Sequence, residues 1–139
     1  MKEDQKNTVL SLFIRSLSAI IERRSKNPKN RKKLNNFNAR INFGLQIEKE
    51  DYIWFKFISN HGKVEINKGR LEDEYDLEIL SVPEDLMFFT NGENSLLHML
   101  FKKNKFGKRK LRINKGTTGR NLKKIIKLPS ILSLENGKK

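Results

Sequence analysis

The N-terminal part of the chain has the periodicity of an amphipathic helix. In residues 8–24, TVLSLFIRSLSAIIERR, apolar residues recur at intervals of three and four, which places them on one face of a helix. Arg23 and Arg24 end this segment, where positive charge complements the helix dipole. Residues 25–38 are polar and basic without periodicity, so we expect them to form an exposed linker.

The middle of the chain alternates apolar and polar residues in the manner of β-strands. Residues 41–47 alternate strictly, and residues 53–58 also place apolar side chains on their second face. A turn that ends at Gly62 leads to a third strand over residues 63–67, and a fourth is expected over residues 75–81. The short connections between the first three strands predict a meander, so we expect a sheet that is at least partly antiparallel.

Two segments that follow carry more bulky apolar residues than a single buried face requires. They are residues 83–91 and 95–104, which we interpret as two short helices. A fifth strand over residues 108–114 and a closing helix over residues 120–128 come next. A run of strands with helices at both ends is typical of the α+β class. We therefore predict a five-stranded, largely antiparallel sheet with helices packed on one face.

The net charge of +14 is concentrated at the two ends of the chain. Residues 1–38 carry +7, residues 39–100 carry −6 and residues 101–139 carry +13. Such asymmetry indicates an anionic partner, either a nucleic acid or an anionic membrane surface. A compositional bias toward Lys, Asn and Ile would explain the same excess without any partner.

The sequence offers few groups for catalysis or metal binding. It has no cysteine and only two histidines, His61 and His98, which argues against a thiolate nucleophile and against a zinc site. It has no nucleophile elbow and no Walker-type loop. We therefore expect no enzyme, no metal and no cofactor. Because the N-terminus lacks the pattern of a signal peptide and no segment is long enough to span a bilayer, we expect a cytoplasmic protein.

One motif would suit nucleic acid. Gly116 and Gly119 form a GxxG pair at the start of the basic segment that we interpret as the last helix. Backbone N–H groups at such a position can meet a phosphate. The alternative function is therefore a basic nucleic-acid-binding module, which we favour less because no pair of aromatic residues accompanies the basic ones.

The order of several segments resembles the sterol carrier protein 2 family. A leading helix precedes a strand meander with a glycine turn, an acidic strand runs into an acidic helix start, and a glycine-lysine strand precedes a basic helix. The likeness extends over residues 39–132. The segments that carry it are HGKVEINKG (61–69), DEYDLEILS (73–81), PEDLMFFTNGE (83–93), GKRKLRINKG (107–116) and RNLKKIIKL (120–128).

The resemblance implies a sheet and helices that enclose an apolar tunnel for a lipid, which would be a fatty acid, an acyl-CoA, a phospholipid, a quinone or a sterol. Met87 and Met99 are unbranched and adapt to varied shapes. A tightly filled core without a cavity is the alternative. We expect these residues to line the ligand site: Phe55, Phe57, Leu86, Phe89, Leu97, Leu100, Phe101, Leu122, Ile125 and Ile126.

A lipid carrier has to meet the membranes that hold its cargo. A basic cluster directly follows the second short helix, and we expect it to contact an anionic surface through Lys102, Lys103, Lys105, Lys108, Arg109 and Lys110. We divide the chain into a helix and basic linker (1–38), a sterol-carrier-like lipid-binding domain (39–132) and a frayed tail (133–139).

Overall fold

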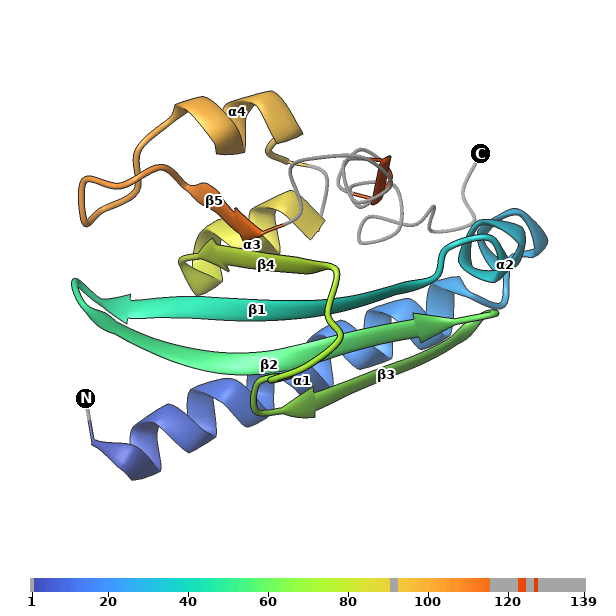
Figure 1. Ribbon diagram of the computed structural model, residues 1–139, viewed down its shortest axis with the longest axis horizontal. Coiled ribbons are helices and arrows are strands. Elements are labelled where there is room, and N and C mark those ends of the chain that lie inside the picture. The colour runs from blue at the N-terminus through green and yellow to red at the C-terminus, as the bar shows by residue number, and fades with distance from the viewer. Residues whose placement is uncertain (1, 91–92, 116–122, 125–126, 128–139) are drawn as a thin grey trace.

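A computed structural model describes residues 2–90, 93–115, 123–124 and 127 of the chain (Figure 1). The described part contains a five-stranded sheet and four helices. These elements are α1 (Glu3–Arg24), α2 (Pro28–Asn35), β1 (Ala39–Glu48), β2 (Asp51–Asn60), β3 (Lys63–Lys68), β4 (Leu77–Ser81), α3 (Pro83–Thr90), α4 (Leu96–Phe101) and β5 (Leu111–Lys115).

The sheet is mixed but mostly antiparallel, and its strand order is β3-β2-β1-β4-β5. The chain runs as an antiparallel meander through β1, β2 and β3. It then crosses back so that β4 lies parallel to β1, and β5 adds antiparallel to β4. The predicted α+β class and the five largely antiparallel strands are therefore confirmed.

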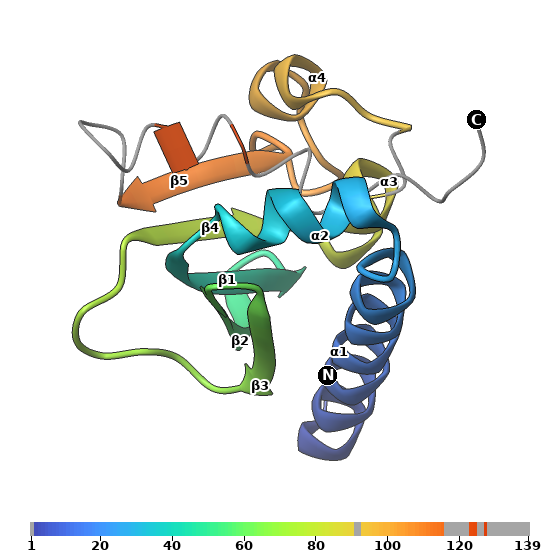
Figure 2. The ribbon, with the colours of Figure 1, turned by 90° about the vertical axis from the view of Figure 1, so that its right-hand side faces the viewer.

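Helices α1 and α3 lie on the same side of the sheet, while the connection from β3 to β4 bows away on the other side (Figure 2). We call the helix-covered side the inner face. The register places Phe43 opposite Phe55 on β2 and beside Ile79 on β4, so all three side chains point to the inner face. Helix α1 covers this face through the residues whose spacing predicted the helix, Leu10, Phe13, Leu17 and Ile21.

The N-terminal half of α1 is tied to the turn between β1 and β2. The Lys6 ammonium lies 3.0 Å from the Asp51 carboxylate, and this hydrogen bond raises the pKa of Lys6 above its ordinary value. The ion pair is partly exposed, so it orients the start of the helix more than it stabilises the fold.

The expected exposed linker over residues 25–38 is wrong, because this stretch contains helix α2 and two core residues. Asn27 caps the helix by accepting a hydrogen bond of 2.9 Å from the Lys29 amide, and proline at the first helical position suits a helix start. Leu34 and Phe37 are 0% and 2% exposed and join the same core as α1. Two apolar residues are too few to give a visible period, which is why the sequence reads as a linker.

The outer face of the sheet carries buried polar side chains that hydrogen-bond to the segments covering it. Asn42 is fully buried there, where its side chain accepts from the Leu71 amide at 2.7 Å and donates to the Leu71 carbonyl at 2.9 Å. Gln46 is also fully buried, and its side-chain oxygen accepts hydrogen bonds from Asn104 at 3.0 Å and Arg112 at 2.8 Å. These bonds attach the β3–β4 connection, the segment between α4 and β5, and strand β5 itself to the central strand β1.

The outer face also carries a charged pair, Arg70 and Glu78. The Glu78 side chain, 5% exposed, accepts hydrogen bonds from the Arg70 guanidinium at 2.6 and 3.0 Å, and its second oxygen accepts from Asn114 at 3.2 Å. The same guanidinium stacks over the Trp54 ring at 4.3 Å. A side chain at Gly44 would meet Leu80 and Trp54 at less than 3 Å, so the close approach of these two groups requires glycine on β1.

The predicted closing helix over residues 120–128 and the tail over residues 133–139 lie outside the described residues, except for positions 123, 124 and 127. None of the helices in the described part is long and apolar enough to cross a membrane.

Candidate functional site

The two short helices cover the half of the inner face that α1 leaves open. Helix α4 begins at a Ser95 cap, whose hydroxyl accepts a hydrogen bond of 3.1 Å from the His98 amide. Leu86 and Phe89 of α3 are buried, as is Met99 of α4. These side chains face the sheet, so the helices extend the apolar core toward β4 and β5.

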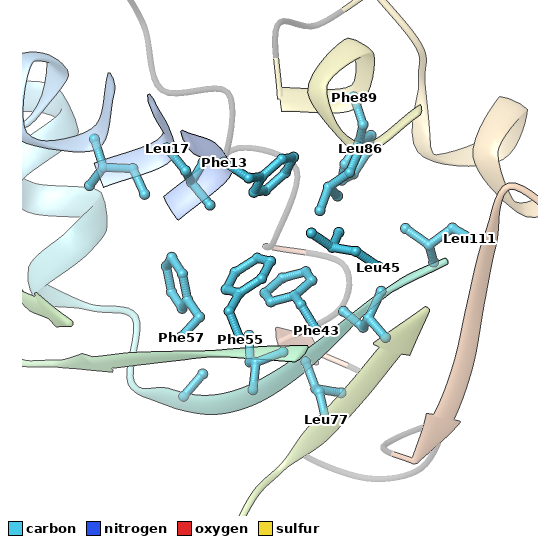
Figure 3. Packing of buried hydrophobic residues seen from close by; sticks show 14 of the residues in the cluster. Phe13, Leu17, Phe43, Leu45, Phe55, Phe57, Leu77, Leu86, Phe89 and Leu111 are labelled. Carbon is cyan, nitrogen blue, oxygen red and sulfur yellow. The ribbon is translucent and has the colours of Figure 1, made fainter. Parts of the chain in front are cut away.

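Stacked aromatic rings form the floor of this core. The rings of Phe43 and Phe55 are nearly parallel, with centroids 4.9 Å apart, and Phe13 of α1 approaches Phe55 at 5.5 Å. Phe57 meets Phe43 edge-on at 6.2 Å. Figure 3 shows the rings of Phe43, Phe55 and Phe57 below Leu86 and Phe89 of α3. Aromatic pairs of this kind contribute beyond the area that they bury.

The structure brings some of the expected lining residues together. Phe55, Phe57, Leu86 and Phe89 belong to one buried cluster, and Leu100 packs against it.

Two of the remaining lining residues are described and lie outside this cluster. Leu97 and Phe101 lie on the solvent side of α4 and are 67% and 62% exposed. Leu122, Ile125 and Ile126 lie outside the described residues. The ligand lining therefore stays a prediction.

Two hollows among the described residues lie away from these side chains. A pocket of about 280 Å³ lies between the end of α1, α2 and β3, and a more open depression of about 630 Å³ lies beside Gln5, Val9 and Glu48. The described walls of these hollows contain none of the expected lining residues. Because the described core side chains pack against one another, the apolar tunnel remains a prediction.

Sequence reasoning missed the smaller pocket because it missed α2. Arg31 of α2 donates a hydrogen bond to the Gly62 carbonyl in the β2–β3 turn, and Gly62 has the positive φ of 90° that favours glycine. Leu34, Val64 and Ile66 give this pocket an apolar floor. The Asn27-Pro28 pair at the start of α2 was the available signal, since a capping Asn followed by Pro is typical of a helix start.

The basic cluster forms a compact hairpin between α4 and β5. The Lys110 amide donates to the Lys102 carbonyl at 2.8 Å, and the Asn104 amide donates to the Lys108 carbonyl at 2.6 Å. The Asn104 side chain accepts from the Phe106 and Lys108 amides at 2.8 and 3.2 Å. The same side chain donates to Gln46 of β1, so the hairpin is fixed to the sheet.

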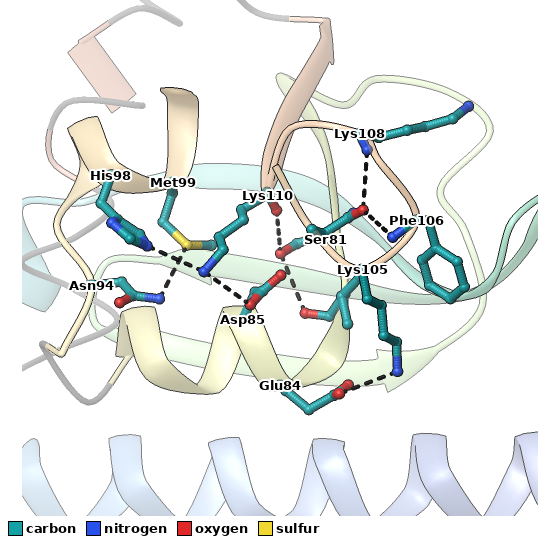
Figure 4. Close-up of polar contacts among 12 residues, drawn as sticks. Ser81, Glu84, Asp85, Asn94, His98, Met99, Lys105, Phe106, Lys108 and Lys110 are labelled. Atoms are coloured by element: carbon teal, nitrogen blue, oxygen red, sulfur yellow. Dashed lines mark hydrogen bonds and ion pairs between the residues drawn. The ribbon is translucent and has the colours of Figure 1, made fainter. Parts of the chain in front are cut away.

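The six cations expected to contact an anionic surface fall into two groups. Lys105, Lys108 and Lys110 lie 3.2, 4.0 and 3.7 Å from the carboxylates of Glu84, Glu50 and Asp85, respectively, and two of these pairs are drawn in Figure 4. In the part of the chain that the structure describes, the other three have no acidic partner. These are Lys102, Lys103 and Arg109, all of them exposed.

The chemistry of the described residues is that of packing and surface charge. No group of three or more His, Asp or Glu side chains that could hold a metal is present among them. His98 lies 3.2 Å from the Lys110 ammonium rather than beside a nucleophile. The GxxG motif of Gly116 and Gly119, which carried the nucleic-acid alternative, lies outside the described residues.

No protein-family model and no curated protein matches the sequence of this chain. Solved structures match its fold. A crystal structure of sterol carrier protein 2 superposes with a TM-score of 0.58 at 13% identity, over 88% of this chain and 95% of that one. Sterol carrier protein 2 from Yarrowia lipolytica, in its apo form, also gives 0.58 at 13% identity, over 86% and 89% of the two chains.

A third similar structure is described as the ubiquinone synthesis protein UbiJ-SCP2. It has a TM-score of 0.50 at 9% identity and covers 76% of this chain and 73% of its own. The chain therefore has the sterol carrier protein 2 fold, as its sequence predicted. At these identities the likeness shows the fold alone.

Proposed function

We propose that the chain is a lipid carrier, not an enzyme, and that it holds one apolar guest between the inner face of the sheet and helices α3 and α4. The observation that carries this proposal is the fold, because it matches sterol carrier protein 2 over most of both chains. The same fold also occurs in a protein described as acting in ubiquinone synthesis. A sterol, a quinone, a fatty acid, an acyl-CoA and a phospholipid are the candidate guests.

The composition of the inner face supports the proposal. The apolar cluster that lies there between β1 and α3 consists of hydrocarbon and thioether side chains. Such a lining takes up apolar guests and excludes water. Met87 and Met99 add side chains that change shape easily. Helices α3 and α4 move away from the sheet to admit the guest. When the guest leaves, the core side chains pack against one another again.

The binding experiment uses the full chain. It is incubated with oleate, a phospholipid and a sterol, analysed by native mass spectrometry, and titrated with a fluorescent fatty acid. We expect one lipid per chain and saturable probe binding that the unlabelled lipid reverses. No retained lipid together with no saturable probe binding would refute the carrier.

A matched pair of variants locates the guest. Leu86 of α3 and Leu17 of α1 are 1% and 0% exposed, so Leu86→Ala and Leu17→Ala should each lower the free energy of unfolding by about 2–5 kcal/mol. Only Leu86 belongs to the proposed lining, so we expect the probe affinity to change in Leu86→Ala and to stay within about twofold of wild type in Leu17→Ala. Equal changes in both would place the guest elsewhere.

A further inference from the structure

The outer side of α4 carries large apolar side chains that the fold leaves uncovered. Leu97 and Phe101 are 67% and 62% exposed and lie four residues apart, so they lie on the same side of the helix. Met99 is fully buried and Leu100 packs on the core. The opposite side of α4 thus packs on the core, and the exposed pair points away from it. Adjacent large apolar residues on a surface indicate an interaction site.

Three cations without an acidic partner in the described part of the chain lie next to this apolar pair. Lys102 and Lys103 follow Phe101 directly in the sequence. Arg109 pairs with Lys103 across the hairpin and donates a hydrogen bond from its guanidinium to the Phe101 carbonyl. We call Leu97, Phe101, Lys102, Lys103 and Arg109 the α4 edge. The other hairpin cations, which pair with carboxylates, are excluded from it.

We propose that the α4 edge binds an anionic lipid bilayer, with Leu97 and Phe101 inserted among the acyl chains and the three cations on the acidic headgroups. Apolar residues flanked by lysine and arginine form the pattern by which a protein segment lies in the membrane interface. A nucleic acid would neutralise the cations and could stack a base on Phe101, but it would leave the aliphatic Leu97 side chain in water. The combination of the two kinds of residue therefore favours a lipid surface.

The position of the α4 edge links it to the proposed carrier function. The role in lipid exchange that we infer for this edge rests on that function. The inner side of the same helix covers the core that we propose for the guest. Insertion of the outer side would bring that core next to the membrane from which the lipid comes. The α4 edge thus serves as the docking site for lipid exchange.

Vesicle flotation tests the proposal. Vesicles of phosphatidylcholine mixed with phosphatidylserine are compared with vesicles of phosphatidylcholine alone, at low and at physiological salt. We expect the full chain to float with the acidic vesicles, to float little with the neutral ones, and to lose binding as salt rises.

Two sets of variants, each with a matched control, separate the α4 edge from total charge. The charge variant Lys102→Gln/Lys103→Gln/Arg109→Gln should reduce partitioning into acidic vesicles at least about tenfold. Its control, Lys26→Gln/Lys29→Gln/Lys32→Gln, removes three charges from exposed positions near α2 and should lose less than about threefold. The apolar variant Leu97→Ser/Phe101→Ser should also lose at least about tenfold. Its control, Leu12→Ser, changes a 55% exposed residue of α1 and should bind as wild type.

Because all the substituted positions are exposed, circular dichroism and the unfolding midpoint should stay unchanged, which excludes misfolding as the cause of a loss. Equal losses in the two charge variants would overturn the proposal, since only total charge would then matter. So would unchanged flotation of the apolar variant. An RNA mobility shift that depends on the α4 edge, without flotation, would assign this surface to nucleic acid instead.

Probe binding without vesicles distinguishes failure of docking from failure of the carrier function. The fluorescent fatty acid should bind the charge variant with the affinity of wild type, because the three cations lie outside the core. If wild type floats but binds no probe, the carrier proposal fails and the docking site stands. If wild type binds the probe but floats with neither kind of vesicle, the docking site fails and the carrier stands.

Discussion

Phe43 and Phe55 point to the inner face of the sheet, whereas Asn42, Gln46 and Glu78 point to the outer face of the same three central strands. Both faces exclude water, but by different means. The inner side chains hold together through apolar contacts that have no fixed direction. The outer side chains each satisfy hydrogen bonds of defined length and angle.

This difference shows where the molecule can change shape. An apolar core can rearrange around a guest at modest cost, because one apolar neighbour replaces another. A buried polar network loses a full hydrogen bond for each partner that moves. The outer face therefore holds the loops through directed bonds, while the inner core holds together through undirected apolar contacts, which suits the proposed guest. The following predictions, in order of decreasing effect, test this division.

The largest effect is expected for Phe55→Ala. This ring is fully buried and contacts Phe13 and Phe43, so its removal should lower the free energy of unfolding by about 3–5 kcal/mol. Urea denaturation followed by circular dichroism measures the change. A loss below about 1 kcal/mol would mean that the inner face has collapsed around the missing ring or was never packed as described.

A smaller loss, of about 1–3 kcal/mol, is expected for Asn42→Ala, because the variant leaves the Leu71 amide and carbonyl without their side-chain partner. Hydrogen exchange should show faster exchange of the Leu71 amide. Asn67→Ala is the control, since Asn67 is exposed on β3 and should change stability by less than about 0.5 kcal/mol. If the two variants behave alike, the outer face does not depend on directed bonds.

The smallest effect is expected for Arg70→Lys. Lysine keeps the charge near Glu78 but loses the planar group that stacks on Trp54 at 4.3 Å and bonds through two nitrogens. We expect a loss of about 0.5–1 kcal/mol, measurable as a shift in the urea midpoint. Arg40→Lys is a suitable comparison, because that guanidinium bonds to the Glu74 carbonyl without a ring stack. Equal losses of stability in Arg70→Lys and Arg40→Lys would show that stacking on Trp54 does not contribute to stability.

Much of the fold could be predicted from the alternation of apolar residues. Ile41, Phe43, Leu45 and their partners on β2 gave both the strands and the buried face, since a period of two is a local property. The outer face could not be predicted in this way. Asn42 and Gln46 have the pattern of solvent-facing strand positions, yet both are fully buried, because loops far away in the sequence cover them.

The candidate site shows the same limit. The apolar excess of α3 and α4 is visible in the sequence, and Leu86 and Phe89 lie in the buried cluster, while their role as ligand lining stays a prediction. A helix of six residues is too short for its period to show which side faces inward, so Leu97 and Phe101 were assigned to the lining although they are exposed. Only tertiary contacts decide between the two sides of so short a helix.

The most direct test of the central claim, that a lipid enters the inner core, is methyl NMR of the full chain with isotope-labelled methionine. Met99 is fully buried and Met87 packs against the core on α3, so both methyl groups report on the proposed site. Titration with oleate should shift the Met99 signal and saturate at one lipid per chain, and Asn42→Ala, an outer-face variant, should show the same shift. An unchanged Met99 signal at lipid concentrations that saturate the fluorescent probe would contradict the account, because the guest would then lie outside the inner core.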